Sequence, residues 1–386
     1  MKIIQITASY KPAYIYGGPI QSVAKLCEAI NDKRVAADSF DLKVLTTTAN
    51  GTKELDITTD QPILVDGVNV TYFKRLTKDH SHFSPGLLLK LKRTLRTPDA
   101  KHIIHIHAWW NLVSVLSCWM AKWYKIPVLL SPRGMLTSYT QNNRNSFSKK
   151  MLHRLIGKKL LQYCDIHATS EQEKRDILKL IKPKSITVIP NLVNVGHSAW
   201  HIAEEQSLVF KLIFLSRIEE KKGLELLFEA LSLLDLNWEL TIAGSGKDEY
   251  ISNLKLKAER LSIDKNIHWV GQVTDEKKYE LMAKHDILVL TSFNENFANV
   301  VIESLSVGTP VLVSDQVGLS DYVLEQQLGW VCQLETNHIK KMILNAFHNQ
   351  DVRENIRQAA PQIIRRDFND QTLATRYLEL YKKLAQ

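Results

Sequence analysis

The chain has 386 residues, and its 50 Lys and Arg outnumber its 41 Asp and Glu, which gives a formal net charge of +9. Hydrophobic residues make up 45% and charged residues 24%, and these shares exclude a disordered or fibrous protein. No stretch reaches the ~18 unbroken apolar residues that a membrane-spanning helix needs, and the length predicts two domains of roughly 150–200 residues each.

The same features predict a cytoplasmic protein with an anionic partner. The apolar run at 1–6 is too short for the apolar region of a signal peptide, and no small-residue cleavage site follows it. Four scattered cysteines without metal-ligand spacing predict buried free thiols. A basic chain suits a phosphate-bearing substrate, a membrane surface or a nucleic acid, and charge alone does not choose among these.

Short β-branched runs alternate with helical patterns along the first half of the chain. We expect strands at 3–6, 42–47, 68–74, 102–108, 127–132, 166–170 and 186–191. A helix is expected after the first of these, with one apolar face made by Ile20, Val23, Ala24, Cys27 and Ile30. This alternation predicts a parallel sheet that helices cover on both faces.

The second half repeats the pattern, with strands expected at 208–217, 239–246, 267–273, 286–292, 310–315 and 329–334. We therefore predict an α/β protein with two Rossmann-like domains, at 1–192 and 208–368, joined by a polar stretch at 193–206. A last helix is expected at 369–386. Open parallel sheets bind ligands beyond the carboxyl ends of their strands, so the loops there hold the candidate site residues.

Two strands of the first half lead into residues that can transfer a proton or bind an anion. His107 ends one strand and Arg133 follows the next. A His at the end of a buried strand is more often structural than catalytic, by roughly two to one. Arg133 is a candidate contact for a phosphate or for an anionic acceptor group.

Basic amphipathic segments occur at 87–96 and 149–159. In the first, Leu87, Leu88, Leu91 and Leu95 share one helical face, and the remainder carries Lys90, Lys92, Arg93 and Arg96. Such a segment suits an anionic membrane surface. An ordinary helix with core leucines and a solvated cationic face explains the same pattern about equally well.

The first strand of the second half ends in Arg217, and Lys222 and Gly223 follow directly before the expected start of a helix. Cations at a strand end beside a helix start suit a diphosphate, although a solvated basic turn looks alike in sequence. Gly244 and Gly246 end the next strand, and glycines there permit a close backbone approach. A G-x-G alone is more often a plain turn.

The most informative segment is T-S-F-N-E-N-F-A-N-V-V-I-E-S-L-S-V-G-T-P at 291–310. A strand ends at Ser292, and a helix begins near Ala298. Glu295 lies in the loop and Glu303 within the helix, so they can contact opposite ends of a long ligand. The backbone amides of Phe297, Ala298, Asn299 and Val300 would then face its phosphates. Two surface carboxylates with no shared role would explain a lone pair of Glu better, at roughly four to one.

The segment E-N-F-A-N-V-V-I-E resembles the E-x7-E motif of retaining glycosyltransferases with the GT-B fold, in particular glycosyltransferase family 4. The tail S-V-G-T-P-V and the R-x4-K-G spacing at 217–223 resemble the same family. The resemblance spans nearly the whole chain and is strongest from 212 to 331. The chain departs from the family pattern at Ser216 and Ala298, where Gly is usual, and at Arg133, where many members have a His.

The resemblance implies two Rossmann-like domains that face each other across a cleft. The first would hold most of the acceptor and the second the nucleotide sugar, and the last helix would pack back on the first domain. Glu295 would hold hydroxyls of the donor sugar and Glu303 the ribose, while Arg217 and Lys222 would neutralise the diphosphate. The remaining implied donor contacts are Gly17, Gly18, Gly244, Gly246, Phe297, Ala298, Asn299 and Val300, with His107 and Arg133 as secondary candidates.

The predicted activity is the retaining transfer of a hexose-type sugar to a glycan or a lipid-linked acceptor, as in bacterial lipopolysaccharide and other surface polysaccharides. No metal and no cofactor are expected, because no Asp-x-Asp occurs in the sequence. A nucleic acid is not expected as a partner. Two alternatives remain: a nucleotide-sugar epimerase or hydrolase of the same fold, and a non-catalytic subunit that binds nucleotide sugars.

Overall fold

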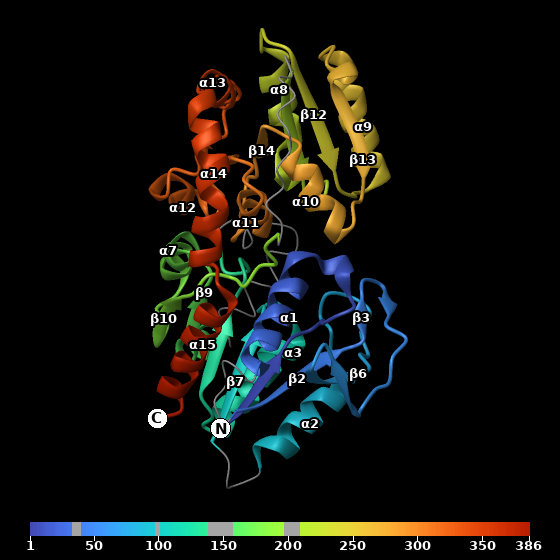
Figure 1. Cartoon of the computed structure of the whole chain (residues 1–386). Helices are drawn as coiled ribbons and strands as arrows, with labels where there is room; N and C mark the ends of the chain where they lie inside the picture. Colours follow the sequence, from blue (N-terminus) through green and yellow to red (C-terminus); the bar gives the residue numbers. More distant parts are fainter. Residues whose placement is uncertain (33–39, 97–100, 138–156, 197–208) are drawn as a thin grey trace. The chain divides into compact units, whose positions relative to one another are not determined.

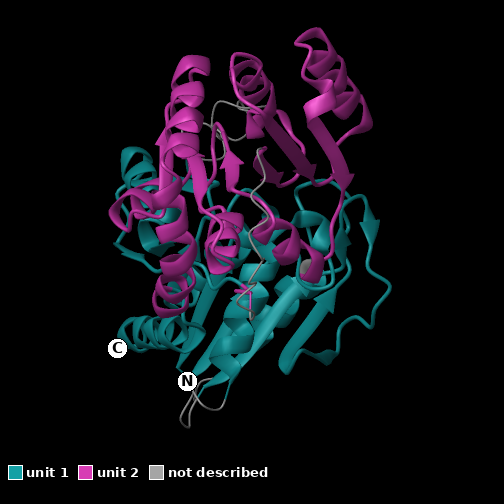
Figure 2. Cartoon of the chain, turned by 45° about the horizontal axis from the view of Figure 1, so that its top comes forward, with its two compact units in different colours: residues 1–193, 368–386 teal, residues 194–367 magenta. Residues whose placement is uncertain are grey.

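The computed structural model describes residues 1–32, 40–96, 101–137, 157–196 and 209–386, and the chain divides into two compact units. Unit 1 comprises Met1–Val193 and Phe368–Gln386, and unit 2 comprises Asn194–Asp367 (Figure 2). Most of the expected linker, at 197–206, lies outside the described residues, as does the basic stretch at 149–156.

Unit 1 is built on an eight-stranded sheet in the order β10-β9-β8-β7-β1-β2-β6-β5 (Figure 1). The seven strands expected from the sequence are confirmed, and they pair in parallel. The antiparallel edge strand β5, which is only four residues long, was not predicted. The strands of this sheet are β1 Lys2–Ile6, β2 Asp41–Thr47, β5 Pro62–Val65, β6 Val68–Phe73, β7 His102–His107, β8 Val128–Ser131, β9 Asp165–Ala168 and β10 Ser185–Val188. The short strands β3 Ala49–Asn50 and β4 Lys53–Glu54 form a separate two-stranded antiparallel sheet.

Helices cover both faces of this sheet. They are α1 Gly18–Asn31, α2 Pro85–Leu95, α3 Leu112–Trp123, α6 Lys158–Tyr163, α7 Glu171–Leu180 and α15 Asp370–Leu384. The helices α2, α3, α6 and α7 contribute to one core with the strands, while α1 packs against α15 (Figure 1). An ion pair of 2.9 Å between Lys25 and Asp370 joins the latter two helices.

Three leucines of α2 belong to the core of unit 1. Leu87 and Leu91 are 0% exposed and Leu95 is 6% exposed, because this helix buries one face against the sheet and α3. The four basic residues of the same segment are exposed. Of the two interpretations of this helix, the structure therefore supports core leucines under a solvated cationic face, and these leucines cannot enter a bilayer.

Unit 2 is built on a six-stranded parallel sheet in the order β13-β12-β11-β14-β15-β16. All six strands expected from the sequence are confirmed: β11 Phe210–Leu215, β12 Trp238–Ala243, β13 Ile267–Gly271, β14 Ile287–Leu290, β15 Val311–Ser314 and β16 Gly329–Cys332. The helices are α8 Leu224–Ser232, α9 Asp248–Arg260, α10 Asp275–Ala283, α11 Asn299–Ser306, α12 Ser320–Glu325, α13 Thr336–His348 and α14 Gln350–Asp367. Because all strands are parallel, the loops that follow them meet at one edge.

All four cysteines are free and buried, as the sequence predicted. Within the described ranges, every helix is too short or too polar to span a lipid bilayer.

Candidate functional site

The loop between β14 and α11 carries the first glutamate of the E-x7-E motif. The backbone N–H of Glu295 donates a hydrogen bond to the carbonyl of Gln316 (3.1 Å), and the N–H of Gly318 donates one to the carbonyl of Glu295 (2.7 Å). These two bonds tie the loop to the segment that follows β15. The side chain of Glu295 is therefore presented from a loop with a defined backbone.

Lys222 and Glu295 form a buried ion pair, although they lie 73 residues apart in the sequence. Their side chains are 6% and 17% exposed. The pair forms because β11 and β14 are neighbours in the sheet, and the N–H of Phe293 also donates to the carbonyl of Lys221 (2.8 Å). The structure thus brings the R-x4-K-G element and the E-x7-E loop into one cluster.

Gly223 allows the two loops to approach each other. Its φ of +69° lies in the left-handed region, and a Cβ on it would stand 2.1 Å from the carbonyl oxygen of Thr291. A residue with a side chain would push the loop after β11 away from the end of β14. The glycine after Lys222 therefore keeps this lysine within reach of Glu295.

The cluster carries three cations and two carboxylates. Burial lowers the pKa of Lys222, the carboxylate of Glu295 acts in the opposite direction, and the charges of Lys221 and Arg217 lower the pKa further. The side chain of Arg217 is 48% exposed, and its Nη1 lies 2.9 Å from Oε1 of Glu219. The other carboxylate oxygen of Glu219 lies 3.7 Å from Nζ of Lys221. A further anion here would be attracted by Arg217 and would compete with Glu295 for Lys222.

Gly244 and Gly246 pack against the segment that carries Arg217. A Cβ on Gly244 would stand 1.8 Å from the carbonyl oxygen of Ser216, and one on Gly246 would stand 2.2 Å from that of Ile218. The segment therefore lies directly on both glycines. A contact of these two glycines with the donor stays a prediction. The structure adds that both glycines position Arg217, which lies between Ser216 and Ile218.

The helix α11 begins directly after a strained residue. Ala298 is its N-cap and has a φ of +68°, and a left-handed conformation costs a residue with a Cβ roughly 1–2 kcal/mol. Its carbonyl accepts the N–H of Val301 (3.0 Å). Phe297 is buried at 2% exposure, and Asn299 and Val300 form the first turn of the helix. The loop thus has the backbone for which the family pattern uses glycine.

Lys278 is a site residue that the sequence analysis missed. Its ammonium lies 2.9 Å from Oε1 of Glu303, and both side chains are only 7% exposed. Lys278 lies in α10, which packs against α11. No motif marked it, because a lysine in a polar helix normally faces solvent. Glu303 is correspondingly not the surface carboxylate that a lone helical Glu would suggest.

In unit 1, Arg133 and His107 lie together at the carboxyl edge of the sheet. Arg133 Nε donates to His107 Nδ1 (3.3 Å), and its Nη1 donates to Ser22 Oγ (2.9 Å) and Asn191 Oδ1 (3.0 Å). Ser22 lies in the first turns of α1, which starts at Gly18 after the left-handed Gly17 (φ +71°). Arg133 itself has a φ of +52°, and such strain often marks functional sites.

This contact fixes the protonation of His107. Because Nδ1 accepts a hydrogen bond from Arg133, the proton of the neutral ring must sit on Nε2, which donates to Gln5 Oε1 (2.7 Å). The amide nitrogen of Gln5 donates to Tyr381 Oη (3.0 Å) in α15. Both nitrogens of His107 are therefore engaged, which favours a structural role over proton transfer.

The hydrogen bonds continue in the same direction across the sheet. Tyr381 Oη donates to His105 Nδ1 (2.7 Å), and His105 Nε2 then donates to Ser131 Oγ (2.7 Å). Ser131 Oγ donates to His167 Nδ1 (2.6 Å), and His167 Nε2 donates to the carbonyl of Ile189 (2.8 Å). One chain of donors thus runs from Arg133 to this carbonyl, and it includes a tyrosine of the last helix.

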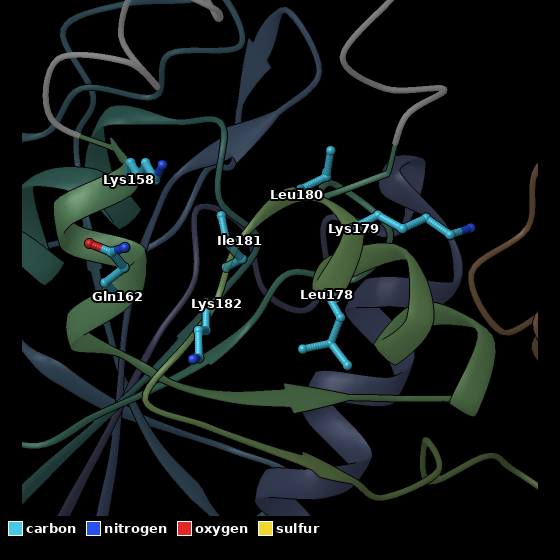
Figure 3. Close-up of a pocket in the computed structure, with 7 residues that line it drawn as sticks. All are labelled: Lys158, Gln162, Leu178, Lys179, Leu180, Ile181 and Lys182. Atoms are coloured by element: carbon cyan, nitrogen blue, oxygen red, sulfur yellow. The ribbon is translucent and has the colours of Figure 1, made fainter.

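A separate shallow hollow of about 350 Å³ lies on unit 1 and contains none of the predicted site residues. Figure 3 shows its lining, which includes Lys158 of α6 and Lys179 and Lys182 from the end of α7 and the residues that follow. Three surface lysines make it cationic, but they do not by themselves define a ligand site.

The chain is similar to known glycosyltransferases over most of its length. The family model "Glycosyltransferase Family 4" matches residues 17–197, and the model "Glycosyl transferases group 1" matches residues 202–363. Glycogen synthase of Mycobacterium tuberculosis is 24% identical over 404 residues, which cover 99% of this chain and 94% of that protein. Phosphatidyl-myo-inositol mannosyltransferase of Mycobacterium leprae is 23% identical over 316 residues, which cover 78% and 79%. The crystal structure of Anabaena HepE with UDP-glucose matches with a TM-score of 0.73 at 19% identity and covers 99% and 100%.

The one-way hydrogen-bond chain predicts that His105, His107 and His167 stay neutral, with the proton on Nε2. Burial is the main cause that lowers the pKa of each, to about 3 for His167. Because the unfolded chain binds protons from about pH 6.5 downward, each such histidine should reduce the free energy of unfolding by about 1.4 kcal/mol per pH unit below that value. The stability that they contribute is complete above pH 6.5 and is lost as the pH falls toward 3.

Two measurements check this prediction. Long-range ¹H–¹⁵N NMR spectra should show three Nε2-protonated neutral rings that do not titrate between pH 5 and 8. Urea unfolding between pH 7.5 and 5 should show the decline in stability. Imidazolium signals from these rings at pH 6 would contradict the assigned direction of the hydrogen bonds.

Proposed function

We propose that this chain, which belongs to glycosyltransferase family 4 and has the GT-B fold, transfers a hexose-type sugar from a nucleotide diphosphate with retention of configuration. The acceptor is a glycan or a lipid-linked sugar. The observation that carries the proposal is the buried cluster of Lys222 and Glu295 with Arg217 beside it, at the strand ends of unit 2.

The diphosphate is the part of the donor that this cluster suits best. Arg217 is half-exposed and can turn its planar guanidinium toward a phosphate, while Lys222 is a point charge in a desolvated position. Electrostatic attraction is stronger where water is excluded, so the leaving diphosphate would be stabilised as its charge develops.

Donor binding exchanges the partners of the buried ion pair. When the diphosphate takes the ammonium of Lys222, the carboxylate of Glu295 becomes available to accept hydrogen bonds from hydroxyls of the sugar. Such an exchange leaves no buried charge without a partner, which is the condition under which a buried ion pair can open at low cost.

Glu303 is suited to the ribose. It lies one turn into α11, and one carboxylate oxygen is held by Lys278 at 2.9 Å. The carboxylate of Glu303 can accept hydrogen bonds from the ribose hydroxyls, and the start of α11 lies between Glu303 and Glu295 in the sequence. The amides of this helix start and the helix dipole would face the phosphates.

The proposed chemistry is substitution on one face of the sugar through an oxocarbenium-like state. The departing phosphate oxygen takes the proton of the acceptor, so no protein base is required, and catalysis rests on positioning and on charge stabilisation. Arg217, Lys222 and the amides of α11 supply the positive charge, and we propose that no metal or cofactor takes part. In unit 1, Arg133 is a candidate contact for an anionic group of the acceptor.

The acceptor class is proposed from the relatives. The mycobacterial relative named a phosphatidyl-myo-inositol mannosyltransferase uses a lipid acceptor according to its name, and the HepE structure contains UDP-glucose. We therefore propose a cytoplasmic enzyme of surface-polysaccharide or lipopolysaccharide assembly, with UDP-hexoses as the first donors to test.

Incubation with several labelled nucleotide sugars and lipid-linked acceptors tests the proposal directly. Transfer with retained anomeric configuration, unchanged by excess chelator, is the expected result. Conversion of the donor without an acceptor would instead indicate an epimerase or hydrolase, and binding without any turnover would indicate a non-catalytic subunit. Inverted product would contradict the proposed mechanism.

The first variants test the diphosphate cluster. Arg217→Ala and Lys222→Met should each reduce turnover by roughly 10²–10³-fold, because each removes a preorganised charge at the leaving group. Lys221→Met is the matched control, because it removes the adjacent positive charge, which belongs to a side chain 33% exposed, and it should remain close to wild type. Thermal unfolding checks that each variant folds. Near-normal turnover of both site variants would exclude these residues from the reaction.

The second set separates the two glutamates. Glu303→Gln and Lys278→Met should weaken binding of a nucleoside diphosphate by roughly 10–100-fold, as expected for a hydrogen bond to a charged group of ~1.5–3 kcal/mol. Both variants should also bind the nucleoside diphosphate no more tightly than its 2′,3′-dideoxy analogue, which lacks the ribose hydroxyls. Glu295→Gln should leave the affinity for the nucleoside diphosphate and the preference over the dideoxy analogue unchanged, and it should reduce sugar transfer. Calorimetric titration measures them, and equal losses of nucleotide affinity in all three variants would refute the assigned orientation of the donor.

A further inference from the structure

Three helices of unit 1 form one layer on the sheet. The helix α3 contacts both α2 and α6, and the inner residues of all three belong to the same core. Cys118 Sγ in α3 lies 3.4 Å from Cys164 Sγ at the end of α6, and Lys122 Nζ donates to the carbonyl of Lys159 (3.4 Å). We call residues 85–96, 112–125 and 158–163 the cationic helix layer.

The layer contains no carboxylate. Among its residues there is no Asp or Glu, whereas its exposed positions include Lys90, Lys92, Arg93, Arg96, Lys122, Lys125, Lys158 and Lys159. The formal net charge of the whole chain is only +9. Nearly all of this excess is thus concentrated on one helical layer, and such a concentration is unusual, because soluble surfaces normally mix both signs.

Two tryptophans lie on the outside of the same layer. Trp119 is 50% exposed and Trp123 is 73% exposed, one helical turn apart on α3. Their ring centroids are 6.0 Å apart with an interplanar angle of 42°. Leu89 of α2 is 48% exposed. Single exposed apolar side chains are ordinary on protein surfaces, but two neighbouring tryptophans on one helix form a contiguous apolar patch, and such patches mark contacts with a partner.

We propose that the cationic helix layer docks on an anionic lipid bilayer, with Trp119 and Trp123 in the headgroup region. Tryptophan is enriched at membrane–water interfaces, and lysines and arginines around it attract anionic lipids. The buried leucines of α2 take no part in this contact. The tryptophan pair, which the amphipathic pattern of 87–96 did not reveal, supplies the apolar contact instead.

Other occupants fit the layer less well. Single-stranded nucleic acid is bound in a cationic groove along which successive bases stack on aromatic rings, whereas these two tryptophans project from one helix with their ring planes at 42°. A second copy of the chain would bring two layers of the same charge together, which is unfavourable. The layer contains none of the residues of the proposed donor site, so attachment and sugar transfer are separable.

Vesicle co-sedimentation of the full chain tests the proposal. The protein should sediment with vesicles of phosphatidylcholine and phosphatidylglycerol, remain in the supernatant with phosphatidylcholine alone, and be released by high salt. Lys92→Gln with Arg93→Gln should weaken binding roughly 10–30-fold. Arg260→Gln with Lys265→Gln, two exposed cations of unit 2, is the matched control and should bind like wild type.

A second experiment reports on the tryptophans. Brominated lipids should quench part of the tryptophan fluorescence of the wild type, and Trp119→Phe with Trp123→Phe should abolish this quenching. Trp119→Ser with Trp123→Ser should reduce sedimentation, whereas serines at the exposed Leu64 and Leu256 should not. Thermal unfolding verifies that every variant folds.

Three results would overturn the proposal. The first is equal recovery in the supernatant with both vesicle types. The second is equal loss of binding in the layer variant and its matched control. The third is a concentration-dependent dimer, or a complex with single-stranded RNA, that is lost in the tryptophan variants while vesicles remain unbound.

Discussion

A buried ion pair between Lys222 and Glu295 connects the two strand-end loops on which the candidate donor site depends. It exists because β11 and β14 are adjacent in the sheet and because Gly223 lets one loop lie against the carbonyl of Thr291. Removal of either charge would leave the other buried without a partner. The same condition supports the proposal of a nucleotide sugar as ligand, because its diphosphate and its sugar hydroxyls would together offer replacement partners.

Unit 1 uses the equivalent edge of its sheet differently. Its strand ends are filled by neutral side chains whose hydrogen bonds all run in one direction, from Arg133 through His107 to the carbonyl of Ile189. Tyr381 is part of this chain of hydrogen bonds, so the last helix contributes to the arrangement of the strand ends although it is remote in sequence. The cost of burying so many polar groups is offset because each has a partner.

The charged side chains of the two units differ in burial and, with it, in whether they have a partner of opposite charge. In unit 2, the buried cations Lys222 and Lys278 are each matched by a glutamate, as burial requires. In the cationic helix layer of unit 1, the cations are exposed and unmatched by any carboxylate of the layer. Exposed charges need no partner for folding, and their concentration in this layer agrees with the membrane contact that we propose for it.

The order of strands and helices, the α/β class and the R-x4-K-G and E-x7-E elements could be predicted from the sequence by itself. The periodicity of apolar residues and the ends of strands are local properties of the chain, and a motif of fixed spacing is visible without its surroundings. The tertiary structure decided which of these elements meet. The sequence marked Lys222 and Glu295 separately, but only the strand order pairs them. Lys278 and the Trp119–Trp123 pair had no sequence signal, because whether a helical side chain is buried or exposed depends on which neighbour the helix packs against.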